Sequence, residues 1–398
     1  MSQQLISRNP DLLRLQEDGY EVAVVAGHLV VANVPYVTSA RTVARGSLVS
    51  TLTLSGERTQ RPDTHVTMFV GAAPCDAAGS PLTKIIIGSA TTPLGGGLVV
   101  NHTFSSKPAV GYYDDYYAKM STYVAILSAE AEALEPDATA RTRRVVANDD
   151  LESPFVYLDT ATTRAGIGEV SQKLMGERIW IVGVGGTGAY VLDQVAKTPV
   201  DEIHLVDPDD FLQHNAFRAP GAASLDELRA RPTKVDHLAL LYGRMHRGIV
   251  PHAVRLGLDN LGLLANATFV FLCLDAGDDK AAIISELERL DLPFIDVGMG
   301  LHLIDGSLVG QLRVTTSTPG MREQIWSKGR IPLKGAGVDD VYSRNIQVAD
   351  LNMVNAGLAI MRWKRHRGFY KDLEGEHFSL FTLDGNHMLN EDRPGEAA

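Results

Sequence analysis

The sequence contains only two cysteines, Cys75 and Cys273, which excludes both a disulfide framework and a four-cysteine zinc site. No apolar run approaches the length of a membrane span, and the first eight residues lack the charged-then-apolar plan of a signal peptide. The formal net charge of −11 argues against the phosphate backbone of a nucleic acid as a partner. We therefore expect a cytoplasmic protein that binds neither nucleic acid nor membrane.

The chain has 398 residues, enough for two or three domains with cores of their own. Residues 1–135 are expected to form a smaller α+β domain, with a hairpin at 20–34 and an amphipathic helix at 113–134. Residues 136–150 are polar and charged, which is typical of a linker. From 151 to 398 strands and helices alternate, which predicts an α/β domain with a mixed, mostly parallel sheet flanked by helices.

An apolar strand at 178–182 runs directly into a glycine-rich turn, and a helix follows. Such a turn offers backbone N–H groups and a helix N-terminus to a phosphate. Gly183 allows the tight turn, Gly185 lets the backbone approach the ligand, and Gly188 lets helix and strand pack closely. The predicted nucleotide-binding turn consists of Gly183, Gly185, Gly186, Thr187 and Gly188.

A second apolar strand, at 202–206, ends in Asp207. A carboxylate at this position can hold the two ribose hydroxyls of a nucleotide. The glycine-rich turn and this aspartate together predict a nucleotide site. By themselves they do not say whether the nucleotide is a dinucleotide cofactor or ATP.

Polar residues further along the chain favour ATP. An enzyme that directs an attack on the α-phosphate must neutralise several phosphate charges and hold Mg²⁺, which calls for Arg and Lys side chains and a carboxylate. The chain supplies Asn215, Arg218, Lys234 and Asp275 in this order behind the turn. An NAD-dependent oxidoreductase stays open as an alternative, but it would leave Arg218, Lys234 and Asp275 without a role. A non-catalytic nucleotide-binding adaptor also stays open, although it would not need those three residues.

The order of these elements resembles the ubiquitin-activating-enzyme-like adenylyltransferases of the ThiF/MoeB superfamily. That family has a Gly-x-Gly-Gly-x-Gly turn, a ribose aspartate, Asn-x-x-Arg, a lysine, and an aspartate at the end of a later strand. Each element has a counterpart here, over roughly residues 151–381. Ala219 replaces the glutamine that usually follows the arginine. Arg164 is the counterpart, in a looser match, of the family's arginine that reaches the ATP of the partner subunit.

The resemblance implies a Rossmann-like adenylation domain that uses ATP and Mg²⁺, with Asn215 donating to the phosphates, Arg218 and Lys234 neutralising them, and Asp275 binding the metal. It implies a homodimer and, as substrate, a ubiquitin-like or sulfur-carrier protein with a C-terminal glycine. A conjugating enzyme is a further implied partner. The first domain is similar in layout to a domain of unknown function that precedes activating-enzyme modules in bacterial ubiquitin-like operons.

Two features could extend this assignment. The residues from 315 to 343 contain no cysteine, and Cys75 and Cys273 have no activating partner nearby in sequence. We therefore expect adenylation without a thioester on this chain.

A group of tyrosines at 112–117 could dock a protein partner or could cover the core of the first domain, and the second explanation is favoured.

Overall fold

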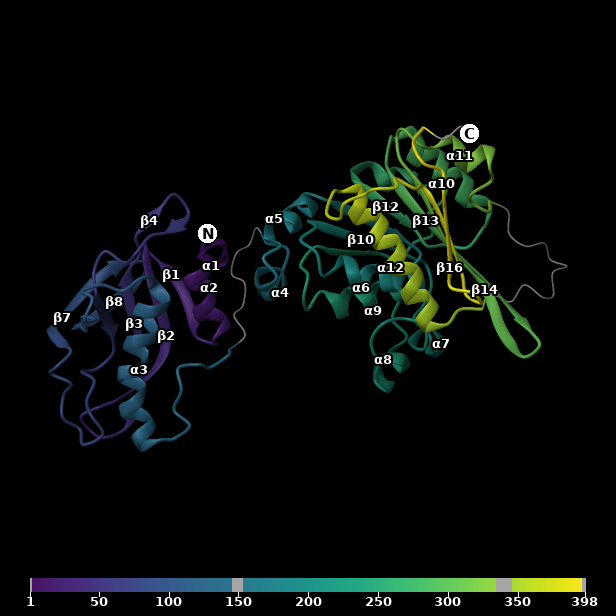
Figure 1. Cartoon of the computed structure of the whole chain (residues 1–398). Helices are drawn as coiled ribbons and strands as arrows, with labels where there is room; N and C mark the ends of the chain where they lie inside the picture. Colours follow the sequence, from purple (N-terminus) through teal and green to yellow (C-terminus); the bar gives the residue numbers. More distant parts are fainter. Residues whose placement is uncertain (1, 145–152, 334–345, 396–398) are drawn as a thin grey trace. The chain divides into compact units, whose positions relative to one another are not determined.

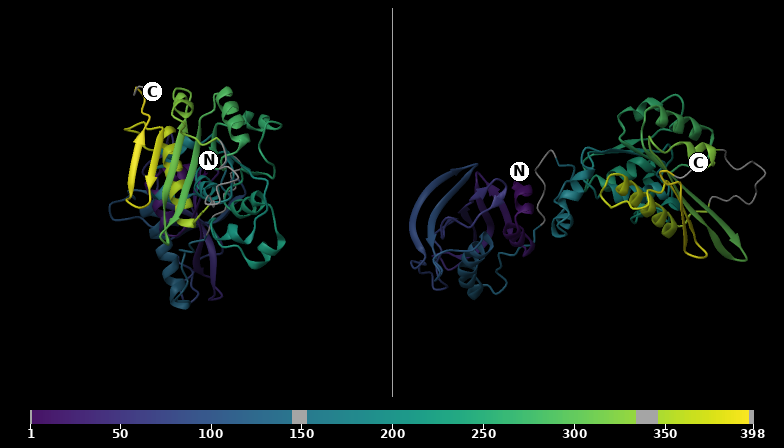
Figure 2. Two further views of the ribbon diagram at one scale, coloured as in Figure 1. Left: turned by 90° about the vertical axis from the view of Figure 1, so that its right-hand side faces the viewer. Right: turned by 45° about the horizontal axis from the view of Figure 1, so that its top comes forward.

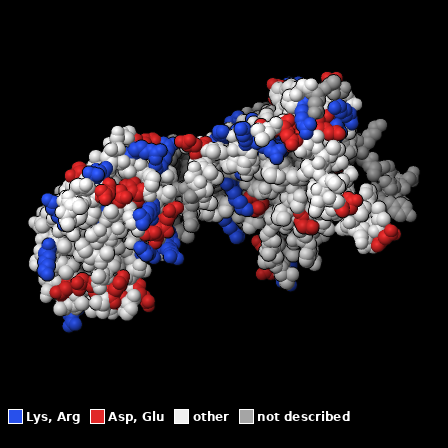
Figure 3. Space-filling view, in the orientation of Figure 1, with Lys and Arg blue, Asp and Glu red and all other residues white. Residues whose placement is uncertain are grey.

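The computed structural model describes residues 2–144, 153–333 and 346–395. The chain divides into two compact units, Met1–Asp150 and Leu151–Ala398, whose elements are labelled in Figure 1. Within the described ranges, no helix has the length and apolar character needed to cross a membrane. On the face of each unit that Figure 3 shows, basic and acidic side chains are interspersed.

The first unit is built on a six-stranded antiparallel sheet in the order β1-β2-β3-β6-β8-β7. The strands are β1 (Glu21–Val25), β2 (His28–Val37), β3 (Val43–Thr51), β6 (Val66–Val70), β7 (Ile86–Gly95) and β8 (Leu98–Ser105), with a small pair β4 (Leu54–Ser55) and β5 (Arg58–Thr59). The helices are α1 (Ser2–Arg8), α2 (Pro10–Glu17) and α3 (Tyr116–Leu134).

Local sequence explains the two clearest elements of this unit. The expected hairpin forms because Ala26 and Gly27 both take positive φ, 47° and 77°, as a two-residue turn between β1 and β2 requires. Helix α3 begins where the Asp115 side chain accepts a hydrogen bond from the N–H of Ala118 at 2.7 Å. Its buried face packs into the core.

The tyrosine group belongs mainly to this core. Tyr113 and Tyr116 are buried, and the Tyr116 hydroxyl accepts a hydrogen bond from the N–H of Thr53 at 2.7 Å, whereas Tyr112 is exposed. The described part of the expected linker, up to residue 144, also contributes buried side chains, Ala138 and Ala140. The remainder of that linker lies outside the described residues.

The second unit confirms the expected fold class. Its eight-stranded sheet has the order β11-β10-β9-β12-β13-β14-β15-β16, in which the first five strands are parallel and the last three join antiparallel. The strands are β9 (Arg178–Val182), β10 (Glu202–Val206), β11 (Ile249–His252), β12 (Phe269–Leu272), β13 (Phe294–Ile304), β14 (Ser307–Ser317), β15 (Phe378–Thr382) and β16 (His387–Glu391). Figure 2 shows the antiparallel strands at the green and yellow end of the chain.

Helices cover both faces of this sheet because its central strand is apolar on both sides. Ile179 and Ile181 of β9 enter a core with α6 (Thr187–Val195) and α12 (Ala349–His366), whereas Trp180 and Val182 enter a second core with α10 (Asp278–Arg289). The other helices are α4 (Thr160–Arg164), α5 (Gly168–Ser171), α7 (Gln213–Ala216), α8 (Leu225–Ala230), α9 (Lys234–Tyr242), α11 (Glu323–Ser327) and the 3₁₀ helices at Gln172–Leu174 and Leu261–Asn266.

Strand register aligns the ends of three neighbouring strands. Val182 of β9 lies opposite Val206 of β10 and Leu272 of β12, so the chain leaves all three strands at one edge. That edge is the carboxyl end of the parallel part of the sheet, where open α/β sheets bind their ligands.

Candidate functional site

A cavity of about 870 Å³ opens at this edge. Eight of the residues singled out in the sequence line it: Gly183, Gly185, Gly186, Thr187, Asp207, Arg218, Lys234 and Asp275. They come from the ends of β9, β10 and β12 and from the segments around α7 and α9. The fold therefore brings together residues that lie up to 92 positions apart (275 − 183).

The glycine-rich turn leaves space where a phosphate is expected. A Cβ placed on Gly185 would lie 3.8 Å from Nζ of Lys234 and 3.9 Å from Nη2 of Arg218. Helix α6 starts at Thr187, with Gly186 as its N-cap residue. Two cations and a helix N-terminus thus border the open space above Gly185, which is the chemistry of a phosphate-binding turn.

Asp207 holds Lys234 and the backbone of the glycine-rich turn in place through hydrogen bonds. Its Oδ1 accepts hydrogen bonds from Nζ of Lys234 at 3.1 Å and from the N–H of Asp209 at 3.0 Å, and its Oδ2 accepts one from the N–H of Val184 at 3.0 Å. Lys234 also donates to Asp209 at 2.6 Å. A carboxylate offers about four acceptor positions, so one position of Asp207 remains for a ribose hydroxyl.

Asn215 and Arg218 lie around the short helix α7. Asn215 is buried, and its Oδ1 accepts a hydrogen bond from the N–H of Leu212 at 2.9 Å, so the side chain closes the start of α7; it is absent from the cavity lining. Its Nδ2 and the Nε of Arg218 are buried with no hydrogen-bond partner among the described residues. Buried donors without a partner are rare, and a bound phosphate would satisfy that of Arg218.

Asp275 follows β12 and is exposed in the cavity. Within the described residues no group of three His, Cys, Asp or Glu side chains could enclose a metal ion. The donor set nevertheless suits Mg²⁺, which is commonly bound through one or two carboxylates together with substrate phosphates and water. Asp275 is therefore the residue that would hold the metal.

Gly188 takes the close-packing position that the sequence predicted. Gly188 lies inside α6, where an added Cβ would come to 1.8 Å from the carbonyl oxygen of Gly183, so its role is close packing. Arg164 is the last residue of α4. Its side chain lies outside what the structure describes.

The cavity also contains polar residues that the sequence analysis missed. Asn352 and Asn355 come from α12, Arg313 comes from β14, and Lys280 comes from the first turn of α10. Lys280 pairs with Asp296 of β13. The sequence offered one signal for such residues, which is a polar or charged side chain within an otherwise apolar segment. Asp296 between Ile295 and Val297 is an example.

Neither cysteine has the environment of a nucleophile. Cys75 is buried, and burial together with the neighbouring Asp76 carboxylate raises the pKa of its thiol. Cys273 lies just beyond β12 and lines the cavity as a half-buried residue. Burial of its thiol and the Asp296 carboxylate raise its pKa, so it too is a neutral thiol near pH 7.

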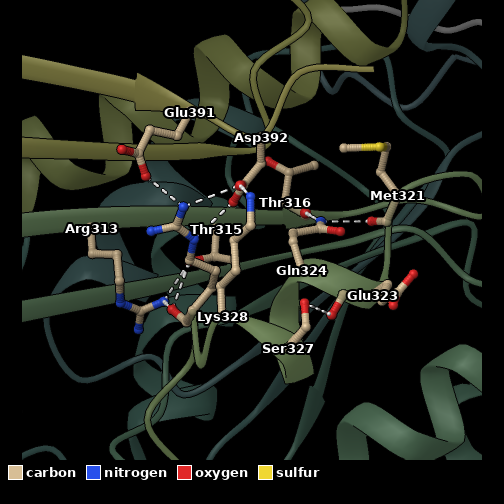
Figure 4. Close-up of polar contacts among 11 residues, drawn as sticks. Arg313, Thr315, Thr316, Met321, Glu323, Gln324, Ser327, Lys328, Glu391 and Asp392 are labelled. Carbon is tan, nitrogen blue, oxygen red and sulfur yellow. Dashed lines mark hydrogen bonds and ion pairs between the residues drawn. The ribbon is translucent and has the colours of Figure 1, made fainter. Parts of the chain in front are cut away.

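The segment after β14 is held by structural contacts. Figure 4 shows Ser327 donating to the carbonyl of Glu323, at 2.9 Å, inside α11, and Lys328 paired with Asp392 at 2.8 Å. Ser317 is fully buried. Residues 334–345, which include Ser343, lie outside the described residues.

Comparison with known proteins adds a domain match and a set of distant structures. Residues 10–160 match the model of a domain of unknown function, DUF6791. No curated protein matches the chain. Solved structures that it resembles include E. coli MccB (17% identity, 56% of this chain and 64% of that chain, TM-score 0.40) and E. coli MccB with MccA (16%, 61% and 74%, TM-score 0.46). PaaA is another (18%, 74% and 92%, TM-score 0.45).

The chain thus spans less than two thirds of MccB in the first of these structures. Similarity at this level concerns the fold and does not carry the activity or partners of MccB over to this chain. Function is therefore inferred from the residues of the cavity.

Proposed function

We propose that the second unit activates a carboxylate by transferring AMP to it from ATP, with release of pyrophosphate. The observation that carries this proposal is the space above Gly185. A methyl group on that glycine would lie 3.8 Å from Nζ of Lys234 and 3.9 Å from Nη2 of Arg218, so both cations border the space. A hydride-transfer site has no triphosphate to neutralise, so two cations at a glycine-rich turn favour ATP over NAD.

Each residue then has a role derived from its position. The turn amides and the start of α6 bind phosphate, Asp207 accepts a ribose hydroxyl, and Arg218 and Lys234 stabilise the charge that develops as pyrophosphate leaves. Magnesium, when bound at Asp275, would neutralise phosphate charge and orient the phosphates. Asn215 fixes the α7 segment that carries Arg218.

The substrate that we propose is the C-terminal carboxylate of a ubiquitin-like or sulfur-carrier protein that ends in glycine, within a bacterial ubiquitin-like conjugation pathway. This part of the proposal rests on the motif resemblance. A conjugating enzyme would be the downstream partner. We assign adenylation to residues 151–398, linked by 136–150 to a separate domain of unknown role at 1–135.

We also propose that the protein is a homodimer. Large apolar side chains are exposed on the second unit, among them Leu240 on α9 and Met353 and Met361 on α12, at 66%, 51% and 40% exposure. A self-complementary interface would cover such residues. Arg164 would then reach the site of the partner subunit.

Isothermal calorimetry with the full chain tests the assignment of the nucleotide. We expect Mg·ATP to bind and NAD to give no heat of binding at the same concentrations. Tight binding of NAD without binding of ATP would contradict the proposal. An ATP–pyrophosphate exchange assay with a carboxylate substrate then separates an enzyme from a non-catalytic adaptor, because only an enzyme returns labelled pyrophosphate to ATP.

A further inference from the structure

A buried cluster of three charged side chains lies beneath the β13–β14 side of the cavity. Asp296 is fully buried; its Oδ1 lies 2.5 Å from Nζ of Lys280 and its Oδ2 lies 2.6 Å from Nη2 of Arg313. Lys280 also donates to the carbonyl of Leu274 at 3.2 Å. Two cations share one carboxylate, so the cluster carries a surplus positive charge of one unit.

Lys280 and Arg313 both line the cavity, but Arg313 is the more exposed of the two. The side chains of Lys280 and Asp296 are 2% and 0% exposed, whereas Arg313 is 14% exposed and lines the cavity. A surplus charge in a poorly hydrated place is costly unless an anion meets it. The carboxylate assigned to the metal, Asp275, follows β12, the strand next to β13.

The guanidinium of Arg313 is held in a fixed position. Its Nη1 donates to Oγ1 of Thr315 at 2.7 Å and to the carbonyl of Arg330 at 3.0 Å, as Figure 4 shows in part. A Cβ on Gly298 would lie 2.6 Å from Nη2, so the group rests directly on the backbone of β13. With the bond to Asp296, three of its five N–H groups are used, and two have no partner among the described residues.

A second unpaired polar group lies on the other face of β13, which packs against α12. Asn355 of α12 is fully buried and lines the cavity, and its Nδ2 donates to the carbonyl of Gly298 at 3.0 Å. Its Oδ1 has no hydrogen-bond partner among the described residues. Asn355 thus leaves one unpaired acceptor in the cavity wall, on the face of the sheet opposite to the side chain of Arg313.

The strand register shows how far Arg313 lies from the glycine-rich turn, which is the phosphate end of the cavity. Asp296 lies opposite Leu272, and Gly298, opposite Arg313, lies two residues further toward the carboxyl edge. Arg313 is therefore level with the glycine-rich turn but three strands away from β9, at a lateral distance of about 14 Å. Asp275, the carboxylate assigned to the metal, follows β12 and therefore lies between the glycine-rich turn and Arg313.

We propose that Arg313 binds the terminal carboxylate of the acyl substrate. The proposal rests on the adenylation function. A carboxylate oxygen attacks the α-phosphorus, a new P–O bond forms, and the bond to the bridging oxygen of the β-phosphate breaks, so that pyrophosphate leaves with the electron pair. Arg313 neither gains nor loses a proton; it orients the nucleophile.

Calorimetry on the full chain, saturated with Mg²⁺ and the non-hydrolysable analogue AMPCPP, tests this. The probes are a synthetic peptide ending in Gly-Gly with a free carboxylate and the same peptide with a C-terminal amide. We expect the free acid to bind the wild type at least roughly tenfold more tightly than the amide, as a charge-assisted hydrogen bond implies. Arg313→Gln should lose that preference and keep its affinity for AMPCPP within about twofold. Arg313→Lys, which keeps the charge but not the planar fork, should fall between the two.

Arg322→Gln is the matched control, because Arg322 has a similar exposure, 15%, and a single carboxylate partner, Asp291, but lies outside the cavity lining. It should bind both probes as the wild type does, and thermal melts confirm that each variant folds. A wild type that does not prefer the free acid, or a preference that survives in a folded Arg313→Gln, would overturn the role of Arg313. Failure of the wild type to bind AMPCPP would instead refute the adenylation function itself.

Discussion

The carbonyl oxygen of Gly183 lies directly against Cα of Gly188, so closely that a Cβ on Gly188 would come to 1.8 Å from it. The site of a methyl group on Gly185, two residues beyond Gly183, meets only the ends of Lys234 and Arg218, at 3.8 and 3.9 Å. One glycine of the turn is thus required for packing, and another leaves room for a ligand.

Alanine substitutions should separate these two roles. We expect Gly188→Ala to destabilise the second unit by about 4 kcal/mol or more, because backbone must move. Gly185→Ala should melt like the wild type but bind ATP at least roughly tenfold more weakly, because its methyl occupies the phosphate position. Gly262→Ala, where an added Cβ meets nothing within 4 Å and which lies outside the cavity lining, is the control. Equal ATP affinity in Gly185→Ala would contradict the assignment of the turn.

Removal of the charged groups should affect catalysis more than folding. Arg218→Ala and Asp275→Ala should each lower the rate of ATP–pyrophosphate exchange roughly 100- to 1000-fold, the usual effect of deleting one group that stabilises transition-state charge. Arg229→Ala on α8 is the control, since Arg229 is exposed and pairs only with its neighbour Asp226 among the described residues. Near-normal exchange in either site variant, with the cognate carrier, would show that the residue has another role.

A mixing experiment tests whether Arg164 acts on the partner subunit. Arg164→Ala and Lys234→Ala should each be inactive as homodimers. After unfolding and refolding together, about half of the dimers are mixed, and each contains one site with both residues, so about a quarter of the wild-type exchange rate should return. A monomeric protein by light scattering, or no recovery in confirmed mixed dimers, would remove the role in trans.

Adenylate formation should not depend on either cysteine. Both thiols have a raised pKa, and Cys75 is further tied to the carbonyl of Ala73, with Sγ at 3.5 Å. We expect Cys75→Ala/Cys273→Ala to retain pyrophosphate exchange, because a neutral thiol is a poor nucleophile. Gel electrophoresis of the trapped carrier with and without thiol reductant gives the direct test. A reductant-sensitive adduct that disappears in Cys75→Ala would identify Cys75 as an acceptor.

The buried Lys119 should make the first unit more stable at alkaline pH. Its Nζ donates to Ser50 at 2.8 Å, and burial lowers its pKa to about 8. The folded state therefore releases the proton before the unfolded state, whose lysine has a pKa of about 10.4. Below pH 8 the cost of burying the charge is fully present, and it is relieved as the pH rises, so stability should increase between about pH 8 and 10 by up to about 3 kcal/mol.

Thermal melts from about pH 7 to 10 measure this effect. Lys119→Met should remove the increase, whereas Lys84→Met, at an exposed position, should keep it. The window ends near pH 10, because burial raises the pKa of Tyr123 to about 12 and ionisation of unfolded tyrosine then favours unfolding. A pH-independent melting temperature in the wild type would show that the pKa of Lys119 is not lowered in the folded state.

The sequence alone determined the local elements of this protein. The period of apolar residues indicated β9 and α3, the dipeptide Ala26-Gly27 marked the hairpin, and helix α12 ends before Gly368, whose φ is +70°. These features depend on contacts within a few residues, which the order of side chains specifies. For the same reason the glycine-rich turn and the residues close behind it could be recognised without a structure.

Only the tertiary structure decided which side chains share the cavity. Arg313 and Asn355 carry no motif, and they enter the wall because β14 pairs with β13 and α12 packs against that part of the sheet. Tertiary packing likewise placed Cys273 at the cavity wall. Strand register and helix packing are set by burial over the whole unit, so residues distant in sequence become neighbours for reasons that no local pattern contains.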